Sequence, residues 1–297
     1  MNYIVETNNL TKKFRNKLAV NKVNMHIKKG DIYGFIGKNG AGKTTAMKML
    51  LGLIYPTEGD IKLFGSANLD VGRRKIGSLI EAPGLYKNCT AFENMKRFSI
   101  LYGGTDKEIK EILEIVGLGN TGSRKAGNFS LGMRQRLGIA ISLLGNPELL
   151  ILDEPINGLD PAGIKEIRDT ILKLNKERGV TFLISSHLLD ELGKITTTYG
   201  IVNDGVLVEE VSAKELMNRC KQNLKINVSN VRKSEMILKN NGYLTEYQVK
   251  DNAIILYSNF DKAAEINGLL VGNGIKVSEL TSNSADFEDY FIERNGK

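Results

Sequence analysis

The chain contains the stretch Gly37-Lys38-Asn39-Gly40-Ala41-Gly42-Lys43-Thr44-Thr45, which satisfies the pattern G-x-x-x-x-G-K-[ST]. An apolar run at residues 32–36 precedes it and a helical pattern follows it, which is the strand–loop–helix context that the pattern requires. The glycines let the backbone curl so that successive N–H groups point toward a phosphate chain, and the helix dipole adds to the attraction. The stretch therefore predicts a nucleoside triphosphate site.

Individual side chains of this loop have separate expected tasks. Lys43 would reach the β- and γ-phosphates, and the Thr44 hydroxyl would hold Mg²⁺. A glycine-rich turn can match the pattern by chance, but the flanking strand and helix weaken that interpretation. We expect nucleotide contacts along the whole loop, at Gly37, Asn39, Gly40, Ala41, Gly42, Lys43, Thr44 and Thr45.

The composition is that of a soluble globular protein, with 41% hydrophobic and 25% charged residues. The length of 297 residues favours one large and one small domain. The longest apolar region, 137–152, is interrupted by Gly145-Asn146-Pro147-Glu148, and the first residues lack a signal-peptide pattern. Cys89 and Cys220 lie in unrelated contexts, which argues against a disulfide or a zinc site. We therefore expect a cytoplasmic protein.

Positive charge is concentrated early in the chain. The net charge is +7, and residues 10–56 hold ten Lys or Arg but one acid, Asp31. Such a field would attract a polyanion such as ATP. A solvated basic face explains every lysine except Lys43 equally well. No nucleic-acid partner is expected, because aromatic residues are not interleaved with the basic ones.

Apolar runs and helical patterns alternate through the first two thirds of the chain. This alternation indicates a layered α/β domain with a largely parallel core sheet, an antiparallel layer from the early strands, and a helical subdomain at about 82–145. The expected strands are 3–8, 21–27, 32–36, 61–64, 149–152, 181–185 and 199–203. The expected helices lie near 43–53, 91–101, 107–116, 131–145, 163–177 and 188–194.

The pattern changes after Glu210, where strands and helices follow the order β-α-β-β-α-β of a ferredoxin-like unit. We place the domains at 1–215 and 220–297, and expect a last helical segment at 286–292. The expected strands of the smaller domain are 224–228, 243–249, 253–257 and 275–280, with helices near 231–240 and 261–272.

A second phosphate-site element reads Leu149-Leu150-Ile151-Leu152-Asp153-Glu154-Pro155. Four apolar residues indicate a buried strand, and the carboxyl end of such a strand is where parallel sheets place ligand chemistry. Asp153 would hold Mg²⁺, and Glu154 would orient and deprotonate an attacking water. A surface Asp-Glu pair before a turn is the alternative.

The stretch Thr181-Phe182-Leu183-Ile184-Ser185-Ser186-His187 repeats this layout of a buried strand with a polar tip. At the end of a neighbouring strand, His187 could contact the γ-phosphate. A purely structural role is the alternative for His187, and it is the role that we expect for His26.

Together these elements resemble the ATP-binding subunits of ABC transporters over about residues 3–215. The resemblance implies a P-loop NTPase fold of the ABC ATPase type. The signature loop of that family looks like Phe129-Ser130-Leu131-Gly132-Met133-Arg134-Gln135-Arg136, in which Leu131 and Met133 depart from the pattern. By resemblance, Ser130 and Gly132 would contact ATP held by a second, head-to-tail subunit, and Asp160 of a D-loop-like segment would cross the same interface. A simple helix N-cap is the alternative for Ser130.

Two further residues take their expected roles from the same family. Phe14 sits where members place an aromatic residue that stacks on adenine, although a core position would explain it equally. Glu81 stands where most members carry a Gln that contacts Mg²⁺ and water. An ionised Glu only accepts hydrogen bonds and adds a charge, so Glu81 would tie nucleotide binding to the metal. The alternative is a solvent-exposed Glu81 that caps a strand.

The Ile-Glu-x-Pro segment, the Ser-Leu-Gly-Met signature and the small C-terminal domain resemble exporters for lantibiotic immunity or bacitracin resistance. The resemblance implies an ATP- and Mg²⁺-dependent ATPase at the inner face of the membrane, with a separate polytopic permease and a second ATP-binding subunit. Two alternatives stay open: an ATP switch acting on nucleic acid or the ribosome, and the ATPase of a peptide-sensing complex. The sequence does not separate homodimer from heterodimer or name the cargo.

Overall fold

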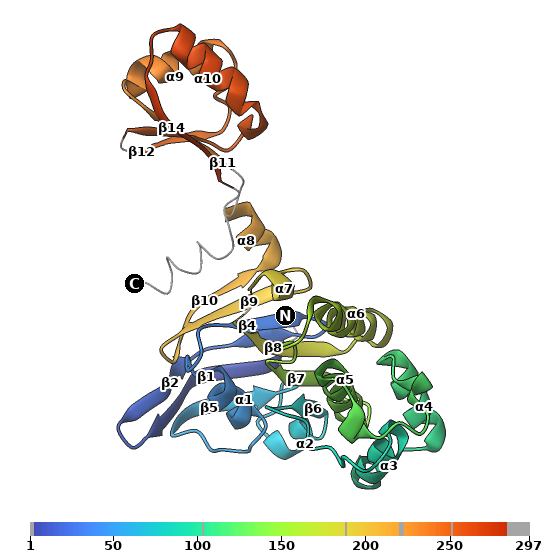
Figure 1. Ribbon diagram of the computed structural model, residues 1–297. Coiled ribbons are helices and arrows are strands. Elements are labelled where there is room, and N and C mark those ends of the chain that lie inside the picture. Colours follow the sequence, from blue (N-terminus) through green and yellow to red (C-terminus); the bar gives the residue numbers. More distant parts are fainter. Residues whose placement is uncertain (1–2, 103, 188, 220–222, 251, 284–297) are drawn as a thin grey trace. The chain divides into compact units, whose positions relative to one another are not determined.

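The computed structural model describes residues 3–102, 104–187, 189–219, 223–250 and 252–283 (Figure 1). Contacts between Cα atoms divide the chain into two compact units, residues 1–213 and 214–297. The expected helical segment at 286–292 lies outside the described residues.

A six-stranded sheet forms the centre of the first unit, in the order β10-β9-β4-β8-β7-β6. All neighbours are parallel except β9 and β10, as predicted for the core sheet. Every residue of β4, β7 and β8 is buried, because strands covered on both faces require an apolar sequence throughout. The bounds are β4 (Ile32–Ile36), β6 (Ile76–Leu79), β7 (Leu149–Asp153), β8 (Thr181–Ser186), β9 (Thr198–Asn203) and β10 (Val206–Ser212).

The predicted antiparallel layer is built around one long strand, β1 (Tyr3–Phe14). It pairs with β2 (Lys17–Val23), β3 (His26–Lys28) and β5 (Glu58–Leu63). The prediction of a single strand at 21–27 was wrong. The amide of Asn24 accepts the N–H of Asn9 and donates to the Lys22 carbonyl, so local bonds replace the ladder there.

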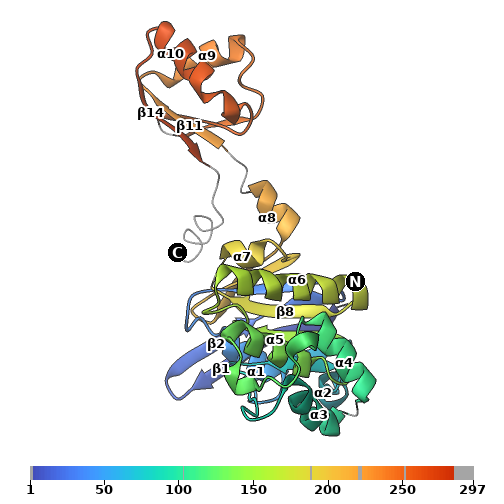
Figure 2. The same cartoon turned by 45° about the vertical axis from the view of Figure 1, so that its right-hand side comes forward.

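Helices cover both sides of the core sheet. Figures 1 and 2 both show α5 between the sheet and the pair α3–α4, which lies in the predicted helical subdomain. Sequence patterns missed α2, β6, β10 and α8. The helices are α1 (Lys43–Leu50), α2 (Leu69–Arg73), α3 (Ala91–Tyr102), α4 (Asp106–Ile115), α5 (Leu131–Ser142), α6 (Pro161–Arg178), α7 (Leu189–Gly193) and α8 (Ala213–Arg219), with 3₁₀ turns η1 (Gly119–Thr121) and η2 (Ala126–Asn128).

The second unit has the predicted order β-α-β-β-α-β, and its four strands form an antiparallel sheet in the order β12-β13-β11-β14. Its core consists of fully buried side chains, among them Leu224, Leu238, Ile254 and Ile266. The elements are β11 (Asn223–Val228), α9 (Val231–Asn240), β12 (Tyr247–Lys250), β13 (Ala253–Leu256), η3 (Phe260–Lys262), α10 (Ala263–Gly272) and β14 (Val277–Asn283).

Gly77 offers a test of the packing between β6 and α5. A Cβ at this position would lie 1.8 Å from the carbonyl oxygen of Ser142, so Gly77→Ala must push the end of α5 away. We expect a loss of about 1–3 kcal/mol in the free energy of unfolding of the first unit, measured by denaturant titration. Gly84→Ala is the control, because a Cβ at Gly84 meets nothing within 4 Å. Equal midpoints for the two variants would contradict the packing described.

Candidate active site

The loop between β4 and α1 has the backbone geometry of a phosphate cradle. Gly40 and Gly42 adopt φ values of +83° and +100°. A Cβ at Gly37 would lie 2.2 Å from the Val202 carbonyl oxygen, and one at Gly42 would lie 2.3 Å from that of Ala19. No side chain caps the start of α1, so its first N–H groups keep their capacity to bind an anion.

Lys43 is a buried cation in this loop, with 5% of its surface exposed. Its Nζ lies 2.6 Å from the carbonyl oxygen of Gly37 and 3.2 Å from that of Lys38. The same Nζ lies 3.3 Å from Oε1 of Glu154. A buried ammonium requires an anionic partner, and in this structure Glu154 supplies it.

Asp153 and Thr44 meet at the end of β7. The Thr44 hydroxyl donates to Oδ2 of Asp153 at 2.8 Å, and Asp153 is 5% exposed. These are hard oxygen donors of the kind that Mg²⁺ prefers. Among the described residues, no group of three or more His, Cys, Asp or Glu could hold a metal. The two side chains therefore fit a Mg²⁺ that takes its other ligands from phosphate and water, which is how nucleotide sites bind this ion.

Glu154 follows Asp153 in a left-handed conformation, with φ of +49°, which is strained for a residue other than glycine. Its Oε1 faces Lys43, while its Oε2 lies 2.9 Å from Nδ1 of His187. His187 comes from the end of β8, the strand beside β7. The structure thus brings Lys43, Thr44, Asp153, Glu154 and His187 together at one edge of the sheet.

Ser185 is a site residue that the sequence reasoning missed. It is fully buried, and its hydroxyl donates to Oδ1 of Asp153 at 2.5 Å. Oγ of Ser185 also accepts the backbone N–H of Glu154, at 2.8 Å. One hydroxyl therefore orients the Asp153 carboxylate and holds the strained backbone of Glu154. The available signal was a serine that directly follows the apolar run Phe182-Leu183-Ile184 and stands beside the polar residues Ser186 and His187.

A pocket of about 340 Å³ lies over the loop, and Phe14 lines one side of it. The ring of Phe14 is 47% exposed, so it is not a core residue, and Lys12 Nζ lies 5.1 Å from its centroid. Gly37 and Ala41 do not line the pocket. The lining residues are Phe14, Lys17, Ala19, Asn39, Gly40, Gly42, Lys43, Thr44, Thr45 and Glu154.

Glu81 lies just beyond β6 in a left-handed conformation, with φ of +62°. Its Oε1 accepts a hydrogen bond from Nζ of Lys48 at 2.7 Å, and this bond lowers the pKa of Glu81. The side chain is 68% exposed. Lys48 belongs to α1, one helical turn beyond Thr44. In this structure the carboxylate of Glu81 therefore pairs with Lys48 of α1.

Ser130, Gly132 and Asp160 form a separate cluster at the N-terminal ends of α5 and α6. The Ser130 hydroxyl accepts the N–H of Met133, and Oδ1 of Asp160 accepts that of Gly163, so both residues are N-caps. A Cβ on Gly132 would lie 3.8 Å from Gly163 Cα, which shows that the two helix ends are adjacent. In the described part of the chain, none of the three lines the nucleotide pocket.

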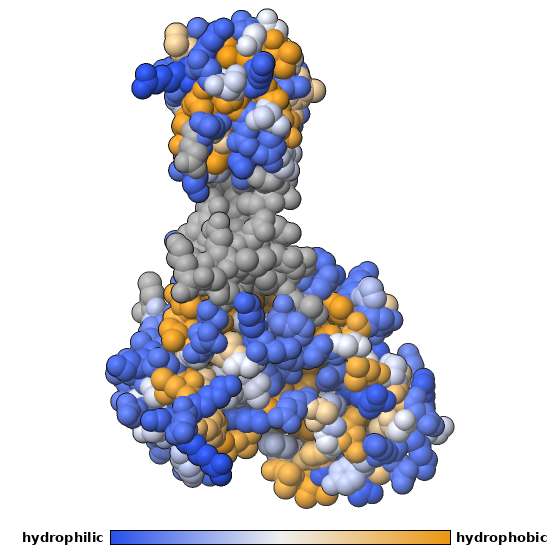
Figure 3. Space-filling view, turned by 60° about the vertical axis from the view of Figure 1, so that its left-hand side comes forward, coloured by the Kyte–Doolittle hydropathy of each residue, from blue (hydrophilic) through white to orange (hydrophobic). Residues whose placement is uncertain are grey.

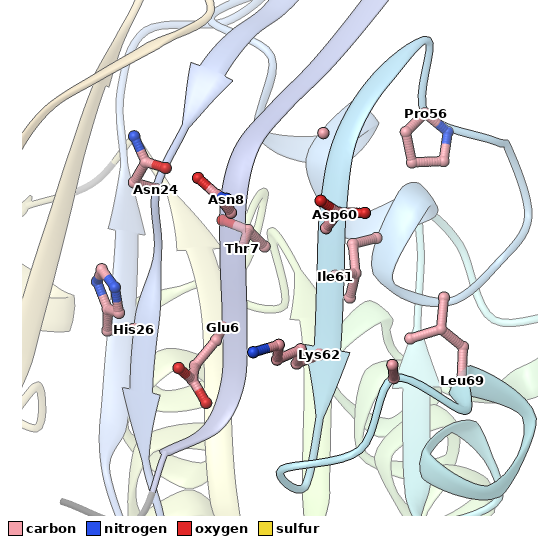
Figure 4. Close-up of a pocket in the computed structure, with 12 residues that line it drawn as sticks. Glu6, Thr7, Asn8, Asn24, His26, Pro56, Asp60, Ile61, Lys62 and Leu69 are labelled. Carbon is pink, nitrogen blue, oxygen red and sulfur yellow. The ribbon is translucent and has the colours of Figure 1, made fainter.

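A larger hollow, of about 690 Å³, lies on the outer face of the antiparallel sheet (Figure 4). Glu6 and Lys62 are cross-strand partners there, and so are Asn8 and Asp60. Charges of both signs alternate along this face, and none of the predicted site residues lines it. His26 is one of its lining residues and also binds Glu210 through Nδ1, at 2.9 Å. The arrangement is that of a solvated sheet surface.

Among the described residues, no helix combines the length and the apolar character that crossing a membrane requires.

Comparisons with known proteins agree with this site. A family model described as ABC transporter matches residues 20–157. The chain is 44% identical to the bacitracin transport ATP-binding protein BcrA of Enterococcus faecalis, over 100% of this chain and 97% of that one. It is 47% identical to the lantibiotic transport ATP-binding protein SrtF of Streptococcus pyogenes, over 70% of this chain and 90% of SrtF.

A solved structure leads to the same fold. The dimeric post-hydrolysis state of the ATP-binding cassette MJ0796, bound to ADP and Pi, matches with a TM-score of 0.63 and 28% identity. The match covers 70% of this chain and 98% of that one. The predicted fold and family are thereby confirmed. The chain belongs to the ATP-binding proteins of the ABC transporter family.

Proposed function

We propose that this chain hydrolyses ATP to drive a separate membrane permease that exports a peptide antibiotic of the bacitracin or lantibiotic kind. One observation carries the ATPase assignment: Lys43, Thr44, Asp153, Glu154 and His187 converge on one edge of the core sheet. The names of BcrA and SrtF supply the transported class. They favour transport over an ATP switch on nucleic acid or the ribosome.

The geometry suggests how the residues would act on Mg-ATP. Nζ of Lys43 would leave Glu154 and bind the β- and γ-phosphates. Oε1 of Glu154 would then be free to accept a proton from the attacking water. His187, held by Glu154 Oε2, would face the γ-phosphate. Thr44 and Asp153 would hold Mg²⁺, which when bound neutralises charge on the phosphates. The water oxygen would bond to the γ-phosphorus as ADP leaves.

A second ATP-binding subunit, a copy of this chain or a relative, would complete the site. Ser130, Gly132 and Asp160 cluster away from the pocket of their own chain. The N-terminal end of α5 carries the positive end of the helix dipole, which suits an anion. In a head-to-tail pair, this cluster would cover the ATP of the partner.

The permease would dock on the helical subdomain, which places the chain at the inner face of the membrane. Hydrophobic side chains reach the surface of the first unit in several places (Figure 3), and Ile100 and Leu101 are 80% and 76% exposed. Ile100 and Leu101 belong to α3, and Tyr86, which precedes this helix and is 51% exposed, packs against its Phe98 at a centroid distance of 6.0 Å. The short segment from Glu81 to Tyr86 would pass movement from the nucleotide to this surface.

Glu154→Gln tests the catalytic assignment. The amide keeps the shape but cannot take a proton, so we expect kcat to fall by about 10²–10⁴-fold. ATP affinity should persist, because Lys43 and the loop are intact. We expect the variant to form a stable dimer with Mg-ATP in sedimentation velocity. ATP hydrolysis at the parental rate would overturn the assignment.

Ser185→Ala tests the role of the buried hydroxyl. The variant leaves Asp153 Oδ1 and the N–H of Glu154 without their partner, at a cost of about 1–3 kcal/mol. We expect kcat to fall about tenfold or more, and the Mg²⁺ concentration for half-maximal ATPase activity to rise. Ser142→Ala is the matched control, since its buried hydroxyl bonds only the Ile139 carbonyl on α5. A merely structural role for Ser185 would give both variants the same Mg²⁺ dependence.

Glu81→Gln tests the proposed link between Glu81 and the metal. If Glu81 exchanges Lys48 for Mg²⁺ when ATP binds, the variant should loosen the Mg²⁺ dependence of turnover. Lys48→Gln breaks the same ion pair and leaves the carboxylate in place, so it should not loosen that dependence. Stability should change little in either variant, because the pair is exposed. Identical Mg²⁺ titrations of Glu81→Gln and the parent would refute the link.

A further inference from the structure

The second unit has a hollow of about 860 Å³ on the open face of its sheet. Side chains alternate along β11, so Leu224 and Ile226 enter the core while Lys225 and Asn227 face the other way. Helices α9 and α10 lie on the core side of the sheet in Figures 1 and 2. The hollow is therefore on the face that these helices leave uncovered.

A small side chain in a central strand creates this hollow. Ala253 of β13 pairs with Lys250 of β12 on one side and with Asn227 of β11 on the other. Ala253 is 4% exposed, and its short side chain forms the floor of the hollow between the longer side chains of Lys250 and Asn227. In the next row, Ile255 lies between Gln248 and Lys225.

Three lysines line the hollow: Lys225, Lys250 and Lys276. Among the described residues, none that lines the hollow is acidic, and none of the three lysines has an ion-pair partner. Glu279, the carboxylate directly across from Asn227, is engaged by the Asn227 amide. The described residues 223–250 and 252–283 contain seven basic and five acidic residues, and three of the seven basic ones line the hollow.

Neutral donors accompany the lysines. The Ser229 hydroxyl accepts the N–H of Lys276 at 3.2 Å, which leaves its own hydrogen available. The side-chain amide of Asn252 lines the same end of the hollow. A ligand with several acceptor oxygens and negative charge would satisfy ammonium, amide and hydroxyl groups together.

We propose that this hollow binds a phosphate group, carried either by an anionic lipid head group or by a soluble phosphate compound. Lysine ammonium groups bind phosphate as point charges, and three of them around one floor would attract its negative charge. The site is separate from the nucleotide site, which belongs to the first unit.

The test uses the full chain with two triple variants. K225Q/K250Q/K276Q neutralises the hollow, and K233Q/K239Q/K262Q removes the same charge from exposed lysines of α9 and η3 in the same unit. One arm measures co-sedimentation with phosphatidylglycerol vesicles against phosphatidylcholine vesicles. The other titrates inorganic phosphate and follows the backbone amide NMR signals of Asn227 and Ala253, which are distinct from those of the nucleotide loop.

We expect the parent to bind at least one phosphate source saturably, and the hollow variant to bind it about tenfold or more weakly. The control variant should stay within about twofold of the parent, since only the site lysines contact the ligand. Binding to vesicles alone would identify a lipid head group, and shifts with inorganic phosphate a soluble source. Absence of binding in both arms, or equal losses in the two triple variants, would overturn the proposal.

Discussion

The ion pair between Lys43 and Glu154 is the interaction on which the site depends. An ammonium that is 5% exposed is stable only beside an anion. The loop provides carbonyl oxygens, and Glu154 at the end of β7 provides the carboxylate. A triphosphate brings far more negative charge to the same place. Its arrival would release the Glu154 carboxylate, the group that we propose as the base. Binding of ATP and activation of the base would then be one event, in which Lys43 exchanges Glu154 for the phosphates.

The parallel sheet makes this exchange possible, because its strands deliver three short segments to one edge. β4 leads into the phosphate loop, β7 ends in Asp153, and β8 ends beside His187. Ser185 ties two of these segments together through Asp153 and the Glu154 backbone. Holding Glu154 at φ of +49° costs free energy, and the buried bonds around it offset that cost.

Much of this arrangement could be predicted from the sequence. The loop, the strand before Asp153 and the strand before His187 each carry a local signal, because buried strands need unbroken apolar runs. Ser185 carries no such signal, since its importance arises from residues 31 and 32 positions away. β6 was missed because Ile76-Gly77-Ser78-Leu79 is short and weakly apolar, and it is a strand through its pairing with β7. The Glu81–Lys48 pair also depends on tertiary contact.

The most direct test of the account is whether the chain works with a membrane permease. Tagged chain would be purified from gently solubilised native cells, and its partners would be identified by mass spectrometry and reconstituted with it in vesicles. The account predicts a polytopic membrane protein in comparable amount, whose presence changes the ATPase rate. Recovery of ribosomal proteins or DNA-bound factors without such a protein would contradict the account.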